Sequence, residues 1–181
     1  LDGNNVLVHK IYEFNQDSYY FDLSYVFVNE NEQKVYFPEQ KLIFAASDFV
    51  GPSSGSQGGR FNKIKQMYYT EKKKTLAKGG GGFLFFKQEA TPTKEAEGDI
   101  EWAGVIGRYF VSLLSTDERT ADGVIANTAE NTTYRTGLVF KDSGITPGSE
   151  SVYRFKAILS EKNKSYLKSI EPNLEAASDT N

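Results

Sequence analysis

One segment of the chain alternates between apolar and polar side chains with a period of two. Within residues 19–28, every second side chain from Phe21 to Phe27 is apolar or aromatic, and the side chains between them include Asp22. Because successive side chains of a strand point to opposite faces of a sheet, this pattern indicates a half-buried β-strand. Residues 5–14 read as a second strand, and the four polar residues between the two segments predict a turn.

Further short segments have strand-like composition and are separated by polar turns. They are expected near residues 34–37, 41–46, 63–69, 123–128, 133–141 and 151–160. Aromatic residues make up 14% of the chain, which suits a β-rich fold because large flat side chains pair across strands. Residues 51–60, rich in Gly and Ser, and the acidic residues 90–99 are expected to be loops. The chain therefore predicts one mainly β domain of antiparallel strands.

Two segments have helical patterns. Nine of the thirteen residues from Trp102 to Leu114 are apolar or aromatic, which predicts a helix over about 100–114. A helix that is apolar around most of its circumference is normally buried, so we expect it to pack against a sheet. The second helix is expected over 161–170, with Ser160 as its N-cap and Pro172 just past its end.

The first helix has an alternative environment. Trp, Arg and Tyr are favoured at wet interfaces, so it could pack partly on a neighbouring element or at a membrane interface. Its thirteen apolar-rich residues would span only ~20 Å, too short to cross a bilayer core of ~30 Å. The side chains expected to pack the two helices or to form an interface are Trp102, Ile106, Arg108, Tyr109, Phe110, Leu113, Tyr166, Leu167 and Ile170. Burial of Tyr109 and Phe110 would make truncation of each to alanine cost ~3–5 kcal/mol.

The sequence predicts no catalytic, cofactor-binding or metal-binding residues. It has no cysteine and one histidine, His9, which we expect on a partly exposed strand face. Gly51–Gly55 fits the G-x-S-x-G pattern, but the Gly- and Ser-rich residues after it are poor helix formers. The net charge of -3 and pI near 5.3 argue against a nucleic-acid partner. The chain begins with Leu1, so we expect it to be a piece of a longer protein.

Three stretches in order carry a family resemblance. They are NVLVHKIYEFNQDSYYFDLSYVFVNENEQKVYF, EWAGVIGRYFVSLL and SGITPGSESVYRFKAILSEKNKSYLKSI. Together they resemble the periplasmic domain of the YidC membrane protein insertases, with its paired long strands, its Trp-led segment with a Tyr-Phe pair, and its closing hairpin followed by a helix. The resemblance runs from about Val6 to Leu174.

The resemblance implies a β-super-sandwich with two short helices, forming a single periplasmic domain over 1–181. The domain would lie on the periplasmic side of the bacterial inner membrane, in a multi-pass protein whose transmembrane core is absent from this sequence. It implies a non-catalytic scaffold or docking module that assists membrane-protein insertion and folding. Its partners would be that transmembrane core, Sec translocon components and nascent membrane proteins, with no cofactor and no small-molecule substrate. The alternative is a stand-alone carbohydrate-binding β-sandwich, and a mutarotase-like enzyme is a third, weaker reading.

Overall fold

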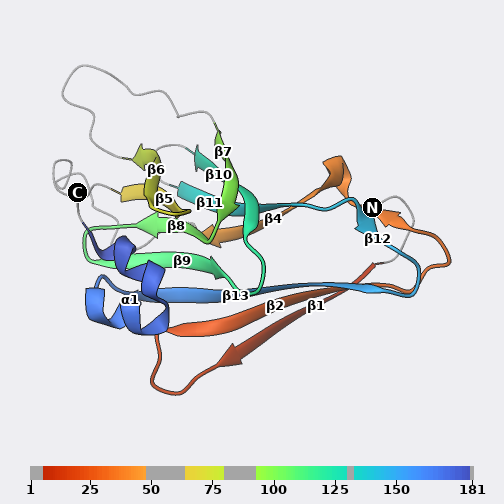
Figure 1. Ribbon diagram of the computed structural model, residues 1–181, viewed down its shortest axis with the longest axis horizontal. Coiled ribbons are helices and arrows are strands. Elements are labelled where there is room, and N and C mark those ends of the chain that lie inside the picture. Colours follow the sequence, from red (N-terminus) through yellow and green to blue (C-terminus); the bar gives the residue numbers. More distant parts are fainter. Residues whose placement is uncertain (1–5, 48–63, 80–92, 130–132, 180–181) are drawn as a thin grey trace.

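Two antiparallel sheets pack face to face in the computed structural model, which describes residues 6–47, 64–79, 93–129 and 133–179 (Figure 1). The strands of the seven-stranded sheet are, in spatial order, β1 (Val6–Phe14), β2 (Tyr20–Asn29), β13 (Glu150–Glu161), β9 (Phe110–Thr116), β8 (Trp102–Ile106), β5 (Ile64–Tyr69) and β6 (Lys73–Gly79). Those of the four-stranded sheet are β4 (Lys41–Ser47), β11 (Thr133–Lys141), β10 (Ala121–Ala129) and β7 (Lys94–Ile100).

Smaller elements lie at the two ends of the sandwich. A two-stranded ladder of β12 (Gly144–Ile145) and β3 (Val35–Tyr36) lies at one end, next to the turn η1 (Pro38–Gln40). The helix α1 (Lys164–Ile170) and the 3₁₀ segment η2 (Pro172–Ser178) lie at the other end, over the seven-stranded sheet (Figure 1). We call α1 and η2 together the C-terminal cover.

An aromatic core fills the space between the two sheets. The alternating face of β2 supplies Leu23, Tyr25 and neighbouring side chains, and the second sheet supplies Phe44 from β4. The Phe44 ring centroid lies 4.9 Å from those of Tyr25, Tyr153 and Phe155. Tilted and edge-on ring contacts of this kind stabilise a core beyond the area they bury. The alternation predicted over residues 19–28 is therefore confirmed, because every second side chain of β2 points into this core.

The predicted mainly β, antiparallel sandwich is confirmed, and most predicted strands coincide with observed ones. The prediction of a loop over the acidic residues 90–99 is wrong for residues 94–99, because β7 begins at Lys94 and pairs with β10. Its alternating acidic side chains lie on the exposed outer face of the second sheet, which accounts for the loop-like composition. The Gly- and Ser-rich segment 51–60, with its G-x-S-x-G pattern, lies outside the described residues.

The helix predicted over 100–114 is wrong. That segment forms the hairpin of β8 and β9, with its turn at Gly107–Tyr109. All five residues of β8 are buried, because Ala103 faces the aromatic core and Trp102 faces a second cluster on the other side of the sheet. A strand covered on both faces shows a continuous apolar run instead of an alternation, and such a run cannot be distinguished from a buried helix by periodicity.

The hairpin requires glycine at one position. A Cβ on Gly104 would overlap the backbone oxygen of Ser112 on the paired strand β9. The two strands therefore approach too closely for any other residue there.

The helix predicted over 161–170 is confirmed, with a later start. α1 begins at Lys164 because Ser160 and Glu161 still belong to β13. Asn163, and not Ser160, is the N-cap: its Oδ1 accepts a hydrogen bond of 3.0 Å from the Tyr166 backbone N–H. Pro172 opens the next helical turn, η2.

Candidate interaction surface

A second hydrophobic cluster lies on the outer face of the seven-stranded sheet, opposite the aromatic core. The sheet contributes Trp102, Leu113 and Ile158, and the C-terminal cover contributes Leu167 and Leu174. Each of these five side chains is at most 1% exposed. The two segments that the sequence analysis predicted as helices therefore do pack together, but the first is the strand pair of β8 and β9 and only the second is a helix.

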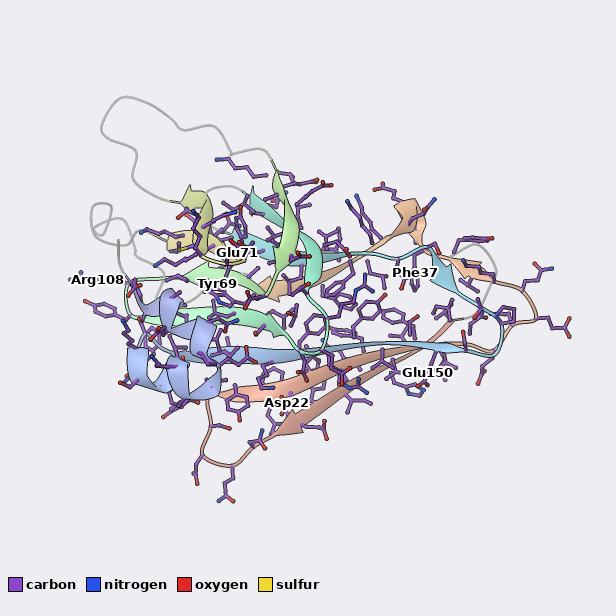
Figure 2. The ribbon with its side chains drawn as sticks, in the orientation of Figure 1. Asp22, Phe37, Tyr69, Glu71, Arg108 and Glu150 are labelled. Carbon is purple, nitrogen blue, oxygen red and sulfur yellow. The ribbon has the colours of Figure 1, made fainter. Side chains whose placement is uncertain are left out.

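Polar contacts fix the C-terminal cover on the sheet around Trp102. The Trp102 indole N–H donates to the Asn173 backbone oxygen at 3.3 Å, and the Tyr69 ring stacks on the indole at 5.7 Å between centroids (Figure 2 labels Tyr69). The Asn173 side-chain amide donates to a carboxylate oxygen of Glu101. The cover is thus held on the sheet by its apolar side chains and by these two hydrogen bonds of Asn173 with residues on β8 or beside it.

Glu171 carries a half-buried carboxylate between the cover and the sheet. Its Oε2 accepts a hydrogen bond of 2.6 Å from Ser115 Oγ, and its Oε1 lies 3.9 Å from Lys156 Nζ. Burial raises the pKa of Glu171, and the contacts with Ser115 and Lys156 oppose that rise only in part. Sequence reasoning missed this residue, because nothing in its local pattern shows that β9 and β13 approach it.

The turn of the β8–β9 hairpin projects past the cover at the same end of the molecule. The Gly107 N–H donates to the Phe110 oxygen at 2.9 Å, and the Lys162 N–H donates to the Tyr109 oxygen at 2.7 Å. The first bond closes the turn, and the second ties it to Lys162, which precedes α1. Burial, together with the charges of Lys65 and Lys73, lowers the pKa of Lys162. The turn is therefore a fixed projection from the sheet.

The exposed side chains at this turn combine aromatic and basic groups. Tyr109 is 59% exposed and Phe110 is 36% exposed, and the Arg108 guanidinium lies 5.0 Å from the Tyr109 ring centroid (Figure 2 labels Arg108). With Glu161, Lys162 and Asn163 they border a shallow hollow of about 500 Å³. We call Arg108, Tyr109, Phe110 and Lys162 the tip patch. Tyr and Arg are among the residues enriched at protein interfaces.

The structure places the nine predicted residues in three different environments. Those packed in the second cluster are Trp102, Ile106, Leu113, Leu167 and Ile170. The expected burial of Tyr109 and Phe110 is wrong, because both lie with Arg108 in the exposed tip patch. Tyr166 is half-buried, and its hydroxyl oxygen accepts a hydrogen bond of 2.7 Å from the Tyr19 backbone N–H.

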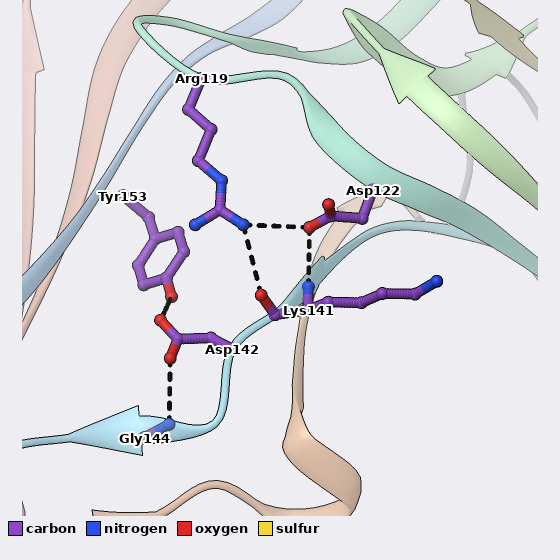
Figure 3. Close-up of polar contacts among 6 residues, drawn as sticks. All are labelled: Arg119, Asp122, Lys141, Asp142, Gly144 and Tyr153. Atoms are coloured by element: carbon purple, nitrogen blue, oxygen red, sulfur yellow. Dashed lines mark hydrogen bonds and ion pairs between the residues drawn. The ribbon is translucent and has the colours of Figure 1, made fainter.

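A cluster of titratable side chains at the opposite end has a structural role (Figure 3). Asp142 accepts hydrogen bonds from the Tyr153 hydroxyl and from the Gly144 N–H. Arg119 pairs with Asp122 at 3.0 Å, and Asp122 also accepts from the Lys141 N–H at 2.8 Å. Burial, and then the contact with Asp142, raises the pKa of Tyr153 well above its usual range, so the phenol stays protonated. The cluster joins β10, β11 and β13.

A trough of about 360 Å³ lies on the outer face of the four-stranded sheet. Its floor consists of Ile43, Ile125 and Val139, and its rim carries charges such as Lys141 and Glu97, which pair at 3.1 Å. The described residues that line the trough include no aromatic side chain. The described lining of the trough therefore offers no ring on which a sugar could stack.

His9 lies exposed on β1, as the sequence predicts. Within the described part of the chain, no three His, Cys, Asp or Glu side chains gather closely enough to hold a metal ion. Nor does any helix in the described ranges have the length and apolarity needed to cross a bilayer.

Comparison with solved structures identifies the fold. The chain is similar to a putative aldose 1-epimerase from Escherichia coli K12, with a TM-score of 0.53 and 9% identity over 87% of this chain and 61% of that one. It is also similar to a galactose mutarotase related enzyme from Lactobacillus acidophilus, with a TM-score of 0.52 and 10% identity over 87% of this chain and 62% of that one. At this level of identity the likeness concerns the fold alone.

Comparison of sequences identifies the family. The chain is 24% identical to the membrane protein insertase YidC of Polynucleobacter necessarius subsp. necessarius (strain STIR1), over 98% of this chain and 32% of that protein. It is 26% identical to the insertase YidC of Methylobacillus flagellatus, over 97% of this chain and 30% of that protein. The chain thus spans about a third of the length of these relatives. The family model of the YidC periplasmic domain matches residues 1–179, and the chain therefore belongs to this family.

Proposed function

We propose that the chain is the non-catalytic periplasmic module of an inner-membrane insertase and rests on the transmembrane core of the same protein. The observation that carries the proposal is the tip patch. It combines exposed aromatic side chains and a basic side chain on a turn that a backbone hydrogen bond ties to Lys162, two residues before α1. A rigid, partly aromatic projection suits docking, because little conformational freedom is lost when it binds.

The arrangement of the cover supports the same orientation. α1 and η2 follow the last strand of the sandwich, and they lie at the end of the domain that carries the tip patch (Figure 1). In the proposed assembly, both would face the transmembrane core. Components of the Sec translocon and nascent membrane proteins would be further partners of the same end.

The titratable groups of the described residues support a non-catalytic module. The oxygens of Asp142 accept hydrogen bonds from Tyr153 and Gly144, and His9 lies exposed on the first strand. The alternative function, a carbohydrate-binding sandwich, has the likeness of fold to epimerase-related proteins in its favour. The trough on the second sheet opposes it, because its lining side chains are aliphatic and charged.

Site-specific crosslinking in the parent insertase tests the proposal. The chain has no cysteine, so a single cysteine can be introduced at Tyr109 in a parent protein freed of others, and then labelled with a thiol-reactive photocrosslinker. Tyr36, which is 65% exposed on β3 at the opposite end, provides the matched control. We expect crosslinks to the transmembrane core from position 109 and none from position 36. Equal crosslinking from both positions would contradict the proposed orientation.

A further inference from the structure

Three lysines gather on the outer face of the seven-stranded sheet, beside the tip patch. In the strand registers, Lys65 and Lys73 lie directly opposite residues that pack in the second hydrophobic cluster on that face. Directly opposite residues of an antiparallel pair share a face, so both lysines lie on the side that carries the C-terminal cover. The Lys162 Nζ lies 3.5 Å from the Gly107 oxygen, at the hairpin turn itself. We call Lys65, Lys73 and Lys162 the lysine cluster.

The three ammonium groups are half-buried and lie close enough to act on one another. Burial, and then the charges of Lys65 and Lys73, lowers the pKa of Lys162. Burial also lowers the pKa of Lys73, where the charge of Asp179 opposes the shift and the charge of Lys65 adds to it. Like charges that the fold holds together are stabilised by an anion between them. The lysine cluster therefore favours a negatively charged ligand.

The adjacent tip patch adds groups that suit a lipid surface better than a small soluble anion. Tyr109 is 59% exposed and Phe110 is 36% exposed at the hairpin turn. Aromatic side chains concentrate at the level of lipid headgroups, and basic side chains beside them contact lipid phosphates. The whole chain has a net charge of -3, so attraction to an anionic surface must come from a local basic region such as this one.

One acidic side chain also borders the hollow of the tip patch. Glu161 lies opposite Phe110 in the register of β13 and β9, whereas the next residue of β9, Val111, packs in the second hydrophobic cluster. Successive side chains of a strand point to opposite faces, so Glu161 points away from the face that carries the lysine cluster. Its carboxylate therefore leaves the basic character of that face intact.

We propose that the lysine cluster and the tip patch together bind the anionic phospholipid headgroups of a membrane surface. The rings of Tyr109 and Phe110 enter the headgroup layer, while Arg108 and the lysine cluster contact lipid phosphates. This inference rests on the proposed function, because that function turns this end of the domain towards the membrane. It adds the lipid surface as a partner beside the transmembrane core.

Vesicle co-sedimentation of the 181-residue chain tests the charge. We expect binding to vesicles of equal parts phosphatidylglycerol and phosphatidylcholine, little binding to phosphatidylcholine alone, and weaker binding as salt is added. Each basic side chain near an anionic surface raises the partition coefficient about fivefold. Lys65→Gln with Lys73→Gln should therefore lower it more than about tenfold. The control, Lys34→Gln with Lys141→Gln, has the same net charge but lies at the opposite end, and it should lower the coefficient less than about twofold.

A second pair of variants tests the aromatic contact. The Arg108 guanidinium lies 5.0 Å from the Tyr109 ring centroid, and at the opposite end Lys34 Nζ lies 5.1 Å from the centroid of Tyr36, which is 65% exposed. Arg108→Gln with Tyr109→Ser should lower the partition coefficient about tenfold. Lys34→Gln with Tyr36→Ser removes the same kinds of group and should lower it less than about twofold. Near-ultraviolet circular dichroism verifies that all four variants fold.

The outcomes separate this inference from the proposed function. Equal binding to neutral and anionic vesicles overturns the inference, and so do equal losses in the variants and their controls, because the contact would then lie elsewhere. Crosslinks from position 109 to the transmembrane core, without binding to anionic vesicles, would support the proposed function and overturn the lipid contact alone. Vesicle binding that the variants weaken as expected, without those crosslinks, would support the lipid contact and contradict docking on the core.

Discussion

Leu167 is the residue on which attachment of the C-terminal cover should depend most. α1 has only seven residues, and Leu167 is its one buried side chain. A helix this short is unstable in water by itself, so packing holds it in place. Leu167→Ala removes about three carbon groups of ~0.8 kcal/mol each, and the cavity left behind adds to this loss. We therefore expect the free energy of unfolding to fall by ~3 kcal/mol and the Tm by ~6–12 °C.

Urea unfolding followed by tryptophan fluorescence measures this loss, because Trp102 lies in the same buried cluster. Leu159→Ala is the matched control, since it makes the same chemical change at a side chain that is 58% exposed. The control should cost less than ~1 kcal/mol. If the two variants lost equal stability, or if Leu167→Ala left it unchanged, the packing of α1 on the sheet would be refuted.

Three further predictions concern the hairpin and the cover. Gly104→Ala should cost ~2 kcal/mol or more in thermal unfolding, because its Cβ would overlap the Ser112 oxygen. Tyr109→Ala should change the unfolding free energy by less than ~1 kcal/mol, since the ring is 59% exposed; a loss of ~3 kcal/mol would indicate that the ring is buried. Burial raises the pKa of Glu171 in the folded state. Between the unfolded-state pKa and this raised pKa, the folded state therefore holds a proton that the unfolded state has released. As the pH falls through the raised pKa, this difference adds stability to the folded state. Glu171→Gln should remove this pH-dependent gain. The unfolding free energy of the variant minus that of the wild type should therefore decline from about pH 7 to about pH 4.5. If this difference did not change with pH, the burial of Glu171 would be contradicted.

The strands with one exposed face could be predicted from the sequence. β2 alternates cleanly because one face meets the aromatic core, and its boundaries fall within one residue of the predicted segment 19–28. The hairpin of β8 and β9 could not be predicted in the same way. Its strands are covered on one face by the second sheet and on the other by the C-terminal cover, which comes about fifty residues later in the chain. Its β-branched residues and the central Gly107 were the local signals that favoured a strand pair.

The candidate surface was only partly visible in the sequence. Trp102 and Leu167 could be singled out because they belong to apolar segments. The contact between these two side chains depends on the order of strands in the sheet, and no local sequence pattern predicts that order. The exposure of Tyr109 follows from its place in a tight turn, which the helical interpretation excluded from consideration.

The position of β13 has a consequence for how the domain is made. β13 lies between β2 and β9, so among the described strands β2 gains its second neighbour only when residues 150–161 arrive (Figure 1). A chain that emerges N-terminus first must leave the edge of β2 that pairs with β13 uncovered while residues 30–149 follow. Contacts between residues so far apart in sequence slow folding and lengthen the exposure of unpaired strand edges. Biogenesis of the domain therefore cannot proceed strand by strand: the seven-stranded sheet is completed by its last strand, and until then the nascent domain itself has an exposed edge to protect.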